Sequence, residues 1–278
     1  MQYHPILTPE SQAWRRGSDP RGLFLAGRAL VLQVAHPTVA AGVREHSGFR
    51  ADPWGRLERT LDSLYTVLYS PDAAAECARL RALHRTIRGV APGGRRYSAL
   101  EPEAYAWVHA TIIETIAVAQ AWAARPLRGE QLDRYYAEMR EVGRMLGLRP
   151  GDLPETWDGF LAWYDGMVRT RLEDSDVVHQ VLDSLSHPAR PPVPHLPGPV
   201  WALARHPVGH LVRLGTVGLL PPPLRERIGV GWSRADDLEL RTLGAALRAT
   251  DPVVPARLRV LGPTYLRVQR LRRRAAAA

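Results

Sequence analysis

The residues with the clearest chemical meaning lie at 79–89, where His84 has Arg81 three residues before it and Arg88 four residues after it. On an α-helix these three side chains share one face. A plain apolar core lacks the partners that buried guanidinium groups need. An iron porphyrin supplies them, because a neutral histidine can bind its iron axially while arginines pair with its acidic propionates. The spacing therefore indicates a haem site with His84 as the iron ligand.

A second polar stripe precedes the first one along the chain. Arg56, Arg59 and Thr60 fall on one side of the helix expected there, and the two stripes can face one another. Together with the segments Gln-Val-Ala-His-Pro at 33–37 and Glu-His-Ser-Gly-Phe at 45–49, they resemble the rubber oxygenase (latex clearing protein) and MpaB oxygenase family, once described only as a domain of unknown function. The resemblance covers roughly residues 20–185 and rests on the order and spacing of these motifs.

The resemblance implies roles for four of these side chains. His84 and Arg88 match the family's histidine and arginine pair, in which the histidine is the proximal iron ligand. Arg56 and Thr60 match a pocket arginine and its small hydroxyl neighbour. The resemblance thus implies non-covalent haem b, held by His84, Arg88 and Arg56, with Thr60 in the distal pocket.

Two positions depart from the family pattern. Arg81 stands where the family can carry a second histidine, so its own role as a haem-contacting residue is open. Arg59 stands where some rubber oxygenases have a lysine that approaches the iron. Lysine can lose its proton and bind a metal, whereas arginine keeps its charge. We therefore expect an open or water-occupied distal position, with Arg59 donating hydrogen bonds to dioxygen.

Glu45 and His46 are the candidates for proton transfer. They end an apolar helix and precede a loop at Ser47-Gly48, where a carboxylate or an imidazole can act as general base on an allylic proton. The structural alternative for His46 is an ordinary cation near a helix C-terminus.

Structural alternatives exist for the haem residues as well. A lone helical histidine such as His84 is often structural, and Arg88 can be a surface cation at a helix end. Arg59 can pair on its own helix with Glu58 or Asp62. His109, in an apolar helix, is expected to be a core histidine and is the second choice as iron ligand.

Apolar residues recur with helical spacing through the whole chain, so the fold class is predicted to be all-α, with a globin-like core as the resemblance implies. Helices are expected near 22–44, 56–69, 73–89, 101–124, 129–146 and 154–171, and again near 200–219, 222–229, 234–249 and 254–272. His36-Pro37 marks a break, because a residue before proline disfavours α geometry. Glycines from 89 to 94 are expected to close the His84 helix.

The expected organisation is one domain with a trailing region. Residues 1–186 form the oxygenase-like catalytic domain, 187–199 a proline-rich linker, and 200–278 a C-terminal helical region packed on the same domain. Repeated prolines prevent a helix in the linker. The final Arg270–Arg274 run and its alanines are expected to be exposed and frayed.

Composition narrows the function classes. The chain has 278 residues, a formal net charge of +9 and 37 basic residues, all of them arginine. Codon composition explains this bias best, because alanine, glycine and proline are also abundant; an anionic partner or membrane surface is the alternative. Cys77 is the single cysteine, so disulfides and multi-cysteine metal sites are excluded, and we expect it to be buried and structural.

Several other chemistries lack their motifs. No Glu-x-x-His pair for a di-iron bundle occurs, and residues 20–185 contain no phosphate loop, nucleophile elbow or His-Glu-x-x-His helix. No Cys-x-x-Cys-His haem attachment site is present. Residues 1–30 lack an apolar signal region, so a cytoplasmic protein is expected.

The resemblance therefore implies a haem-b-dependent oxygenase that uses O2 to oxidise or cleave an apolar, isoprenoid-like or lipid-like small molecule. Nucleic acid is not expected as a partner, and weak membrane-surface association is left open. Two alternatives remain: a non-catalytic haem- or O2-binding protein, and a haem-free arginine-rich binding module.

Overall fold

The computed structural model describes residues 7–91 and 93–277 and is almost wholly helical, which confirms the all-α prediction. Residues 1–6, 92 and 278, which fall within the predicted ranges, lie outside the described residues. The helices are α1 (Gln12–Arg16), α2 (Pro20–Leu23), α3 (Ala26–Val34), α4 (Pro37–His46), α5 (Pro53–Tyr69), α6 (Ala73–Thr86), α7 (Pro102–Ala123), α8 (Glu130–Leu146), α9 (Trp157–Thr170), α10 (Asp176–Ser186), α11 (Gly198–Gly218), α12 (Pro222–Arg227), α13 (Arg234–Thr250), α14 (Ala256–Arg259) and α15 (Gly262–Ala277).

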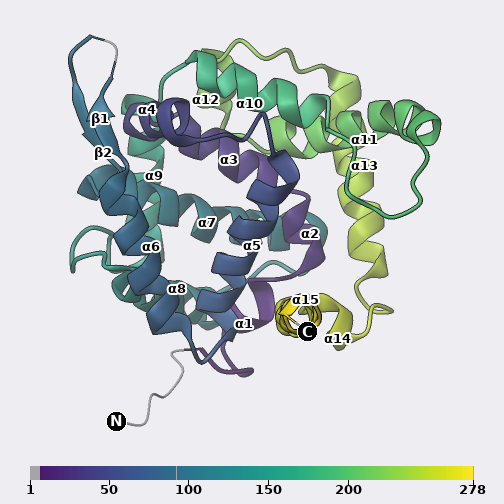
Figure 1. Cartoon of the computed structure of the whole chain (residues 1–278), viewed down its shortest axis with the longest axis horizontal. Coiled ribbons are helices and arrows are strands. Elements are labelled where there is room, and N and C mark those ends of the chain that lie inside the picture. Colours follow the sequence, from purple (N-terminus) through teal and green to yellow (C-terminus); the bar gives the residue numbers. More distant parts are fainter. Residues whose placement is uncertain (1–6, 92, 278) are drawn as a thin grey trace.

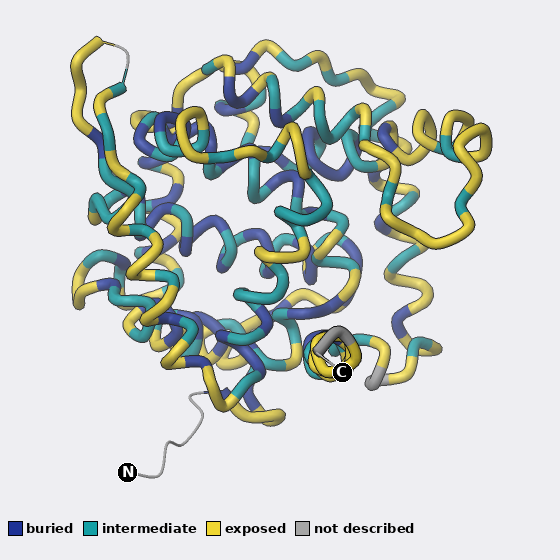
Figure 2. Tube along the Cα trace, viewed as in Figure 1, coloured by how far each residue is buried: buried dark blue, intermediate teal, exposed yellow. Residues whose placement is uncertain are grey.

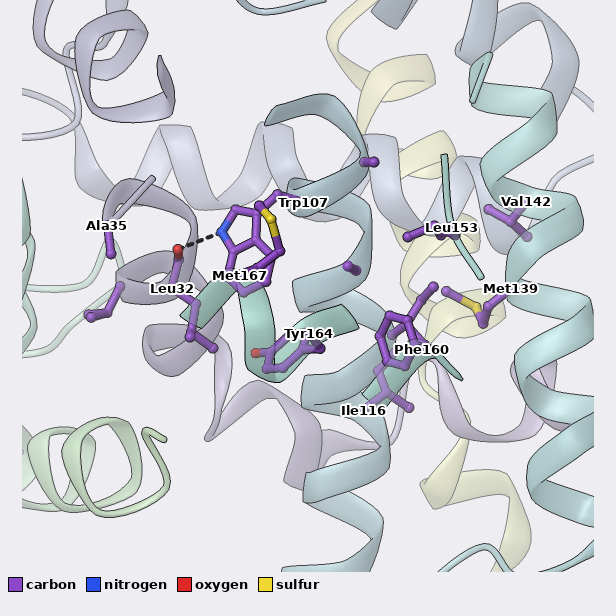
Figure 3. Close-up of a cluster of buried hydrophobic side chains, with 14 of the residues drawn as sticks. Leu32, Ala35, Trp107, Ile116, Met139, Val142, Leu153, Phe160, Tyr164 and Met167 are labelled. Atoms are coloured by element: carbon purple, nitrogen blue, oxygen red, sulfur yellow. Dashed lines mark hydrogen bonds between the residues drawn. The ribbon is translucent and has the colours of Figure 1, made fainter. Parts of the chain in front are cut away.

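Helix α7 runs through the middle of the molecule, with other helices around it (Figure 1). Its apolar side chains are spread around the whole helix, as expected for a buried one. Trp107 of α7 is fully buried, and its indole Nε1 donates to Leu32 O of α3 at 2.8 Å. Phe160 and Tyr164 of α9 fill the same core (Figure 3). The core thus fixes α3 and α9 against the central helix.

The predicted helix over 22–44 is interrupted at the expected place. Helix α3 ends at Val34 and α4 starts at Pro37. His36 is the N-cap of α4, where its Nδ1 accepts a hydrogen bond from the Thr38 amide at 3.3 Å. The amide of the first helical residue has no partner within the helix, so a proline at this position loses no hydrogen bond. Pro37 therefore favours both the break before it and the start of α4.

Helices α5 and α6 form an antiparallel pair joined by the short turn at 70–72. Close to that turn Arg79 Nη2 of α6 donates to Ser63 Oγ of α5 at 3.0 Å. Away from the turn the two helices diverge (Figure 1). Arg56, at the start of α5, and His84, near the end of α6, therefore lie at the open end of this pair.

A two-stranded hairpin follows α6, and the sequence did not predict it. Helix α6 ends at Thr86 rather than 89, and β1 (Arg88–Val90) pairs antiparallel with β2 (Arg96–Ser98), with Arg88 opposite Ser98. Gly93 and Gly94 adopt positive φ angles in the turn, which favours glycine. The prediction that Arg88 shares a helical face with His84 is therefore wrong.

The C-terminal helices pack against the first half of the chain. Helix α11 contacts α3 and α10, α13 contacts α7, and α15 contacts α5. Gln269 Nε2 donates to Glu58 Oε1 at 2.7 Å, and Arg273 Nη2 lies 2.6 Å from Asp62 Oδ2. The run Arg270–Arg274 is exposed, as predicted, but it is not frayed, because it is part of α15, which packs on α5.

Residues 187–197 contain no helix, as the prolines predict. Exposed residues concentrate along this stretch and the first half of α11 (Figure 2). In the described part of the chain, no helix combines the length and the apolar character needed to cross a bilayer.

Candidate functional site

His84 lies half-buried on α6, with its ring edge-on to Tyr105 of α7 at a centroid distance of 5.5 Å. The Nδ1–H donates to Leu80 O, one turn earlier, at 2.7 Å. Burial lowers the pKa of His84, against the opposing effect of the Leu80 hydrogen bond, so the neutral ring is favoured. No described residue hydrogen-bonds Nε2. The backbone carbonyl thus fixes the tautomer that leaves the Nε2 lone pair available, as in metal-binding histidines.

Arg56 is a half-buried cation without an acidic partner. Its Nη1 donates to Ser47 Oγ, and no Asp or Glu of residues 7–91 or 93–277 forms an ion pair with it. Burial, and then the charge of Arg59, lower the pKa of Arg56, which shows that its charge is poorly compensated. Thr60 lies one turn along α5 and donates to Arg56 O at 2.9 Å. The guanidinium of Arg56 could therefore form charge-assisted hydrogen bonds with an anionic group of a ligand.

Arg81 and Arg88 are also without salt bridges in the described part of the chain, but they are exposed. Arg81 covers the end of α8, where a Cβ on Gly147 would lie 2.8 Å from its guanidinium. Arg88 projects from β1, in the hairpin that follows α6. Neither side chain therefore has an acidic partner in the described part of the chain, and only Arg81 lies on the same helix as His84.

Arg59 is placed at the surface, with 69% of its side chain exposed. Its Nη1 donates to Asp52 Oδ2 at 3.2 Å. The alternative prediction, that Arg59 pairs with Glu58 or Asp62, is wrong, because side chains of α15 donate hydrogen bonds to both carboxylates. A hydrogen bond from Arg59 to dioxygen stays a prediction.

Glu45 and His46 meet at a buried tyrosine that sequence reasoning missed. The Tyr97 hydroxyl of β2 donates to Glu45 Oε2, and His46 Nε2 lies 3.1 Å from the same hydroxyl. Burial, then the Glu45 hydrogen bond, raise the pKa of Tyr97 to about 12. The hydroxyl therefore remains protonated and links the imidazole to the carboxylate.

Gly89 of β1 leaves room for this cluster. A Cβ at Gly89 would lie 2.6 Å from Glu45 Oε2 and 2.8 Å from the Tyr97 hydroxyl. Gly89 follows His84 closely in the chain, so the cluster adjoins the end of α6. The signal that could have identified Tyr97 is the alternation Arg96-Tyr97-Ser98 after a glycine-rich turn, which is typical of a strand with one inward side chain.

Other candidate residues have structural roles. His109 is fully enclosed, and its Nε2–H donates to Met139 O at 2.8 Å. Cys77 is buried, as predicted. An apolar pocket of about 180 Å³ lies beside Trp14, Val67 and Tyr69, at the opposite end of α5 from Arg56. Within the described residues, no three His, Cys, Asp or Glu side chains are grouped to hold a metal ion.

This helical architecture and these motifs agree with a family-level match that covers most of the chain. Residues 14–249 match the catalytic domain of the ER-bound oxygenase mpaB/B'/rubber oxygenase family, and the chain belongs to that family. The match continues beyond the proline-rich stretch into α11 and α13, further than the motifs alone indicated.

Two similar proteins are the uncharacterized protein Mb2261 of Mycobacterium bovis and the uncharacterized protein Rv2237 of Mycobacterium tuberculosis. Each is 24% identical over 241 residues, which cover 84% of this chain and 91% of the relative. No solved structure matches the chain significantly. The family therefore indicates an oxygenase, and neither relative adds a substrate.

Proposed function

We propose that this protein is a haem-dependent oxygenase in which His84 binds the iron and O2 oxidises an apolar substrate. Membership of an oxygenase catalytic-domain family supports the reaction class. The observation that supports the cofactor is the hydrogen bond from His84 Nδ1 to Leu80 O, which leaves Nε2 with a lone pair and no partner among the described residues.

The donor set fits a porphyrin better than a metal held by protein ligands alone. The described residues provide no cluster of three ligating side chains, whereas haem brings its own equatorial nitrogens and needs one axial histidine. Haem also carries two propionates, and Arg56 is a half-buried guanidinium without an acidic partner in the described chain. Arg81, on the same helix as His84, and Arg88, in the hairpin that follows that helix, are further exposed cations.

The open end of the α5–α6 pair supports the same proposal. Leu57 and Leu61 of α5 and Leu80 of α6 are half-buried, and Leu83 of α6 is 48% exposed. Burying apolar side chains against a flat hydrophobic group would stabilise this region. We propose that haem lies between these helices.

Bound haem would supply the binding and activation of dioxygen. The protein's own groups orient the reactants and move protons. Glu45 accepts a proton from substrate as a carboxylate, held in position by the Tyr97 hydroxyl. His46 lies on the other side of that hydroxyl, and Glu45 and His46 can both exchange the proton with solvent, because 42% and 36% of their side chains are exposed. Thr60 and Arg56 define the polar side of the pocket.

The substrate class is an isoprenoid-like or lipid-like alkene. The apolar side chains that border the proposed site on α5 and α6 are leucines, which favour an apolar ligand beside the polar groups. A carboxylate base at Glu45 suits abstraction of an allylic proton.

The direct test is the absorption spectrum of protein expressed with added haem precursor, compared with His84→Ala and with His179→Ala, a matched control at an exposed histidine of α10. We expect a stoichiometric Soret band in the wild type and in His179→Ala, and its loss in His84→Ala. Circular dichroism checks that all three proteins are helical. A folded wild type without a Soret band would overturn the haem proposal, and an unchanged band in His84→Ala would reject His84 as the ligand.

A further inference from the structure

The first half of α11 projects from the body of the molecule. At Gly209 the helix crosses the end of α10 so closely that a Cβ would lie 1.9 Å from Ser186 O. The residues before this crossing, from Gly198 to Val208, are mostly exposed (Figure 2). Such a close crossing holds the helix firmly at Gly209 and leaves its N-terminal turns outside the core.

This projection exposes an apolar face as well as polar side chains. Val200, Leu203, Pro207 and Leu211, here called the α11 stripe, recur at helical spacing along one face. Leu203 is 79% exposed, Val200 51% and Leu211 38%. A surface helix normally turns its apolar face to the core and its polar face to solvent. The α11 stripe departs from that arrangement, because its apolar side chains are exposed together with the polar ones, and no described residue covers them.

The segment that carries the α11 stripe is basic, and the acidic side chains that approach α11 come from α13, where Glu239 pairs with His210 and Asp236 lies 3.9 Å from Arg213. The sequence has no Asp or Glu between Asp183 and Glu226. Within that stretch Arg190, Arg205 and His206 are exposed, and Trp201 is half-buried. Tryptophan and arginine beside an apolar helix face are typical of helices that lie in a membrane interface.

We infer that the α11 stripe binds the surface of an anionic lipid bilayer. Its valine and leucines enter the boundary between headgroups and acyl chains, while Arg190 and Arg205 attract acidic headgroups. This inference concerns a surface outside the candidate site and does not depend on haem.

Charge argues against two other occupants. A second copy of the chain would bring one basic, acid-free segment against another, and like charges repel at close range. Nucleic acid needs rows of cations, whereas this face of α11 presents apolar side chains, with Leu203 at 79% exposure.

The α11 stripe lies on a segment that also contacts α5. The linker before α11 accepts a hydrogen bond at Ala189 O from Trp54 Nε1, at 3.0 Å, and Trp54 is two residues before Arg56. Membrane contact at the α11 stripe would therefore bring the start of α5 close to a source of apolar molecules.

The test is flotation of the full-length protein with vesicles of phosphatidylcholine alone or mixed with phosphatidylglycerol. We compare the wild type with Leu203→Glu and with Leu161→Glu. Leu161 of α9 is 42% exposed near Asp158 and Asp165, which makes it the matched control. We expect binding to mixed vesicles that weakens at high salt, a loss of about tenfold in Leu203→Glu, and no change in Leu161→Glu.

Two results would overturn the inference. One is no flotation of the folded wild type with mixed vesicles, and the other is equal flotation of Leu203→Glu. Sedimentation velocity is measured in parallel: a wild-type dimer that Leu203→Glu dissociates, without vesicle binding, would assign the stripe to a second copy instead. Thermal unfolding of each variant confirms that it is folded.

Discussion

Arg28 of α3 and Glu114 of α7 form an ion pair inside the protein, with Arg28 Nη2 2.8 Å from Glu114 Oε1. Arg28 is 2% exposed and also donates to Thr115 Oγ1 and to Leu219 O, at the end of α11. Tyr164 of α9 donates to Glu114 Oε2 at 3.2 Å. One buried guanidinium therefore joins α3, α7 and α11, and through Glu114 also α9.

Removing one partner of this pair will leave an uncompensated buried charge. We expect Glu114→Leu to lower the free energy of unfolding by about 3–5 kcal/mol, and Arg28→Met/Glu114→Leu to recover much of that loss. Arg241→Met, which breaks the exposed pair of Arg241 with Asp237, should cost no more than about 1 kcal/mol. Urea denaturation followed by circular dichroism measures all three. A double variant less stable than Glu114→Leu would contradict this account.

Gly89→Ala tests the space beside the Glu45 carboxylate. The added methyl would contact Glu45 and Tyr97 at distances that force them to move. We expect oxygen consumption with the substrate to fall about tenfold and stability to fall by about 1–3 kcal/mol, as in other overpacked sites. Gly48→Ala is the control, because nothing lies within 4 Å of a Cβ there. Equal activities of the two variants would show that the cluster does not take part in turnover.

Tyr97→Phe separates proton transfer from packing. The ring is kept, while the hydroxyl that joins His46 to Glu45 is lost. We expect turnover to fall about 10²-fold with little change in KM, and the pH profile of turnover to change, because the hydroxyl that bridges His46 and Glu45 is gone and only their direct contact at 3.9 Å remains. The Soret band should not change. If neither Tyr97→Phe nor Glu45→Gln altered oxygen consumption, a haem-binding protein without proton-transfer catalysis at this cluster would be the better description.

His109 gives the fold an acid sensitivity. Burial lowers the pKa of His109 below its ordinary value of 6.5. His109 is therefore protonated more readily in the unfolded chain than in the folded protein. The preferential protonation of the unfolded chain is absent well above pH 6.5 and grows as the pH falls below 6.5. The free energy of unfolding therefore decreases on acidification. We expect urea midpoints to fall less between pH 7 and pH 5 in His109→Gln than in the wild type. The exposed control His187→Gln should keep the wild-type pH dependence.

Most of the longer helices were predictable because they have local signals, whereas α1 and α10 were not predicted. Pro37 and Pro102 start α4 and α7, and apolar residues at helical spacing mark other helices. The hairpin was missed because its strands, Arg-Gly-Val and Arg-Tyr-Ser, are each three residues long, which makes their alternation a weak signal. Its presence removed Arg88 from the helix that carries His84.

The site depended on information that a single sequence does not contain. The pair of His84 with Leu80 O follows from one side-chain rotamer, and Asp52 is the partner of Arg59 because α15 engages Glu58 and Asp62 from more than two hundred residues away. Tyr97 reaches Glu45 only when the hairpin folds against α4. Motif order predicted which residues to examine, while tertiary contacts determined their partners.

The packing of α15 on α5 joins two segments about two hundred residues apart in the chain. Tyr265 packs edge-on against Tyr65, and its hydroxyl donates to Asp62 at 2.8 Å. The helix that carries Arg56 therefore depends for part of its surroundings on residues far along the chain. A change in α15 can disturb the start of the proposed site without touching any residue of it.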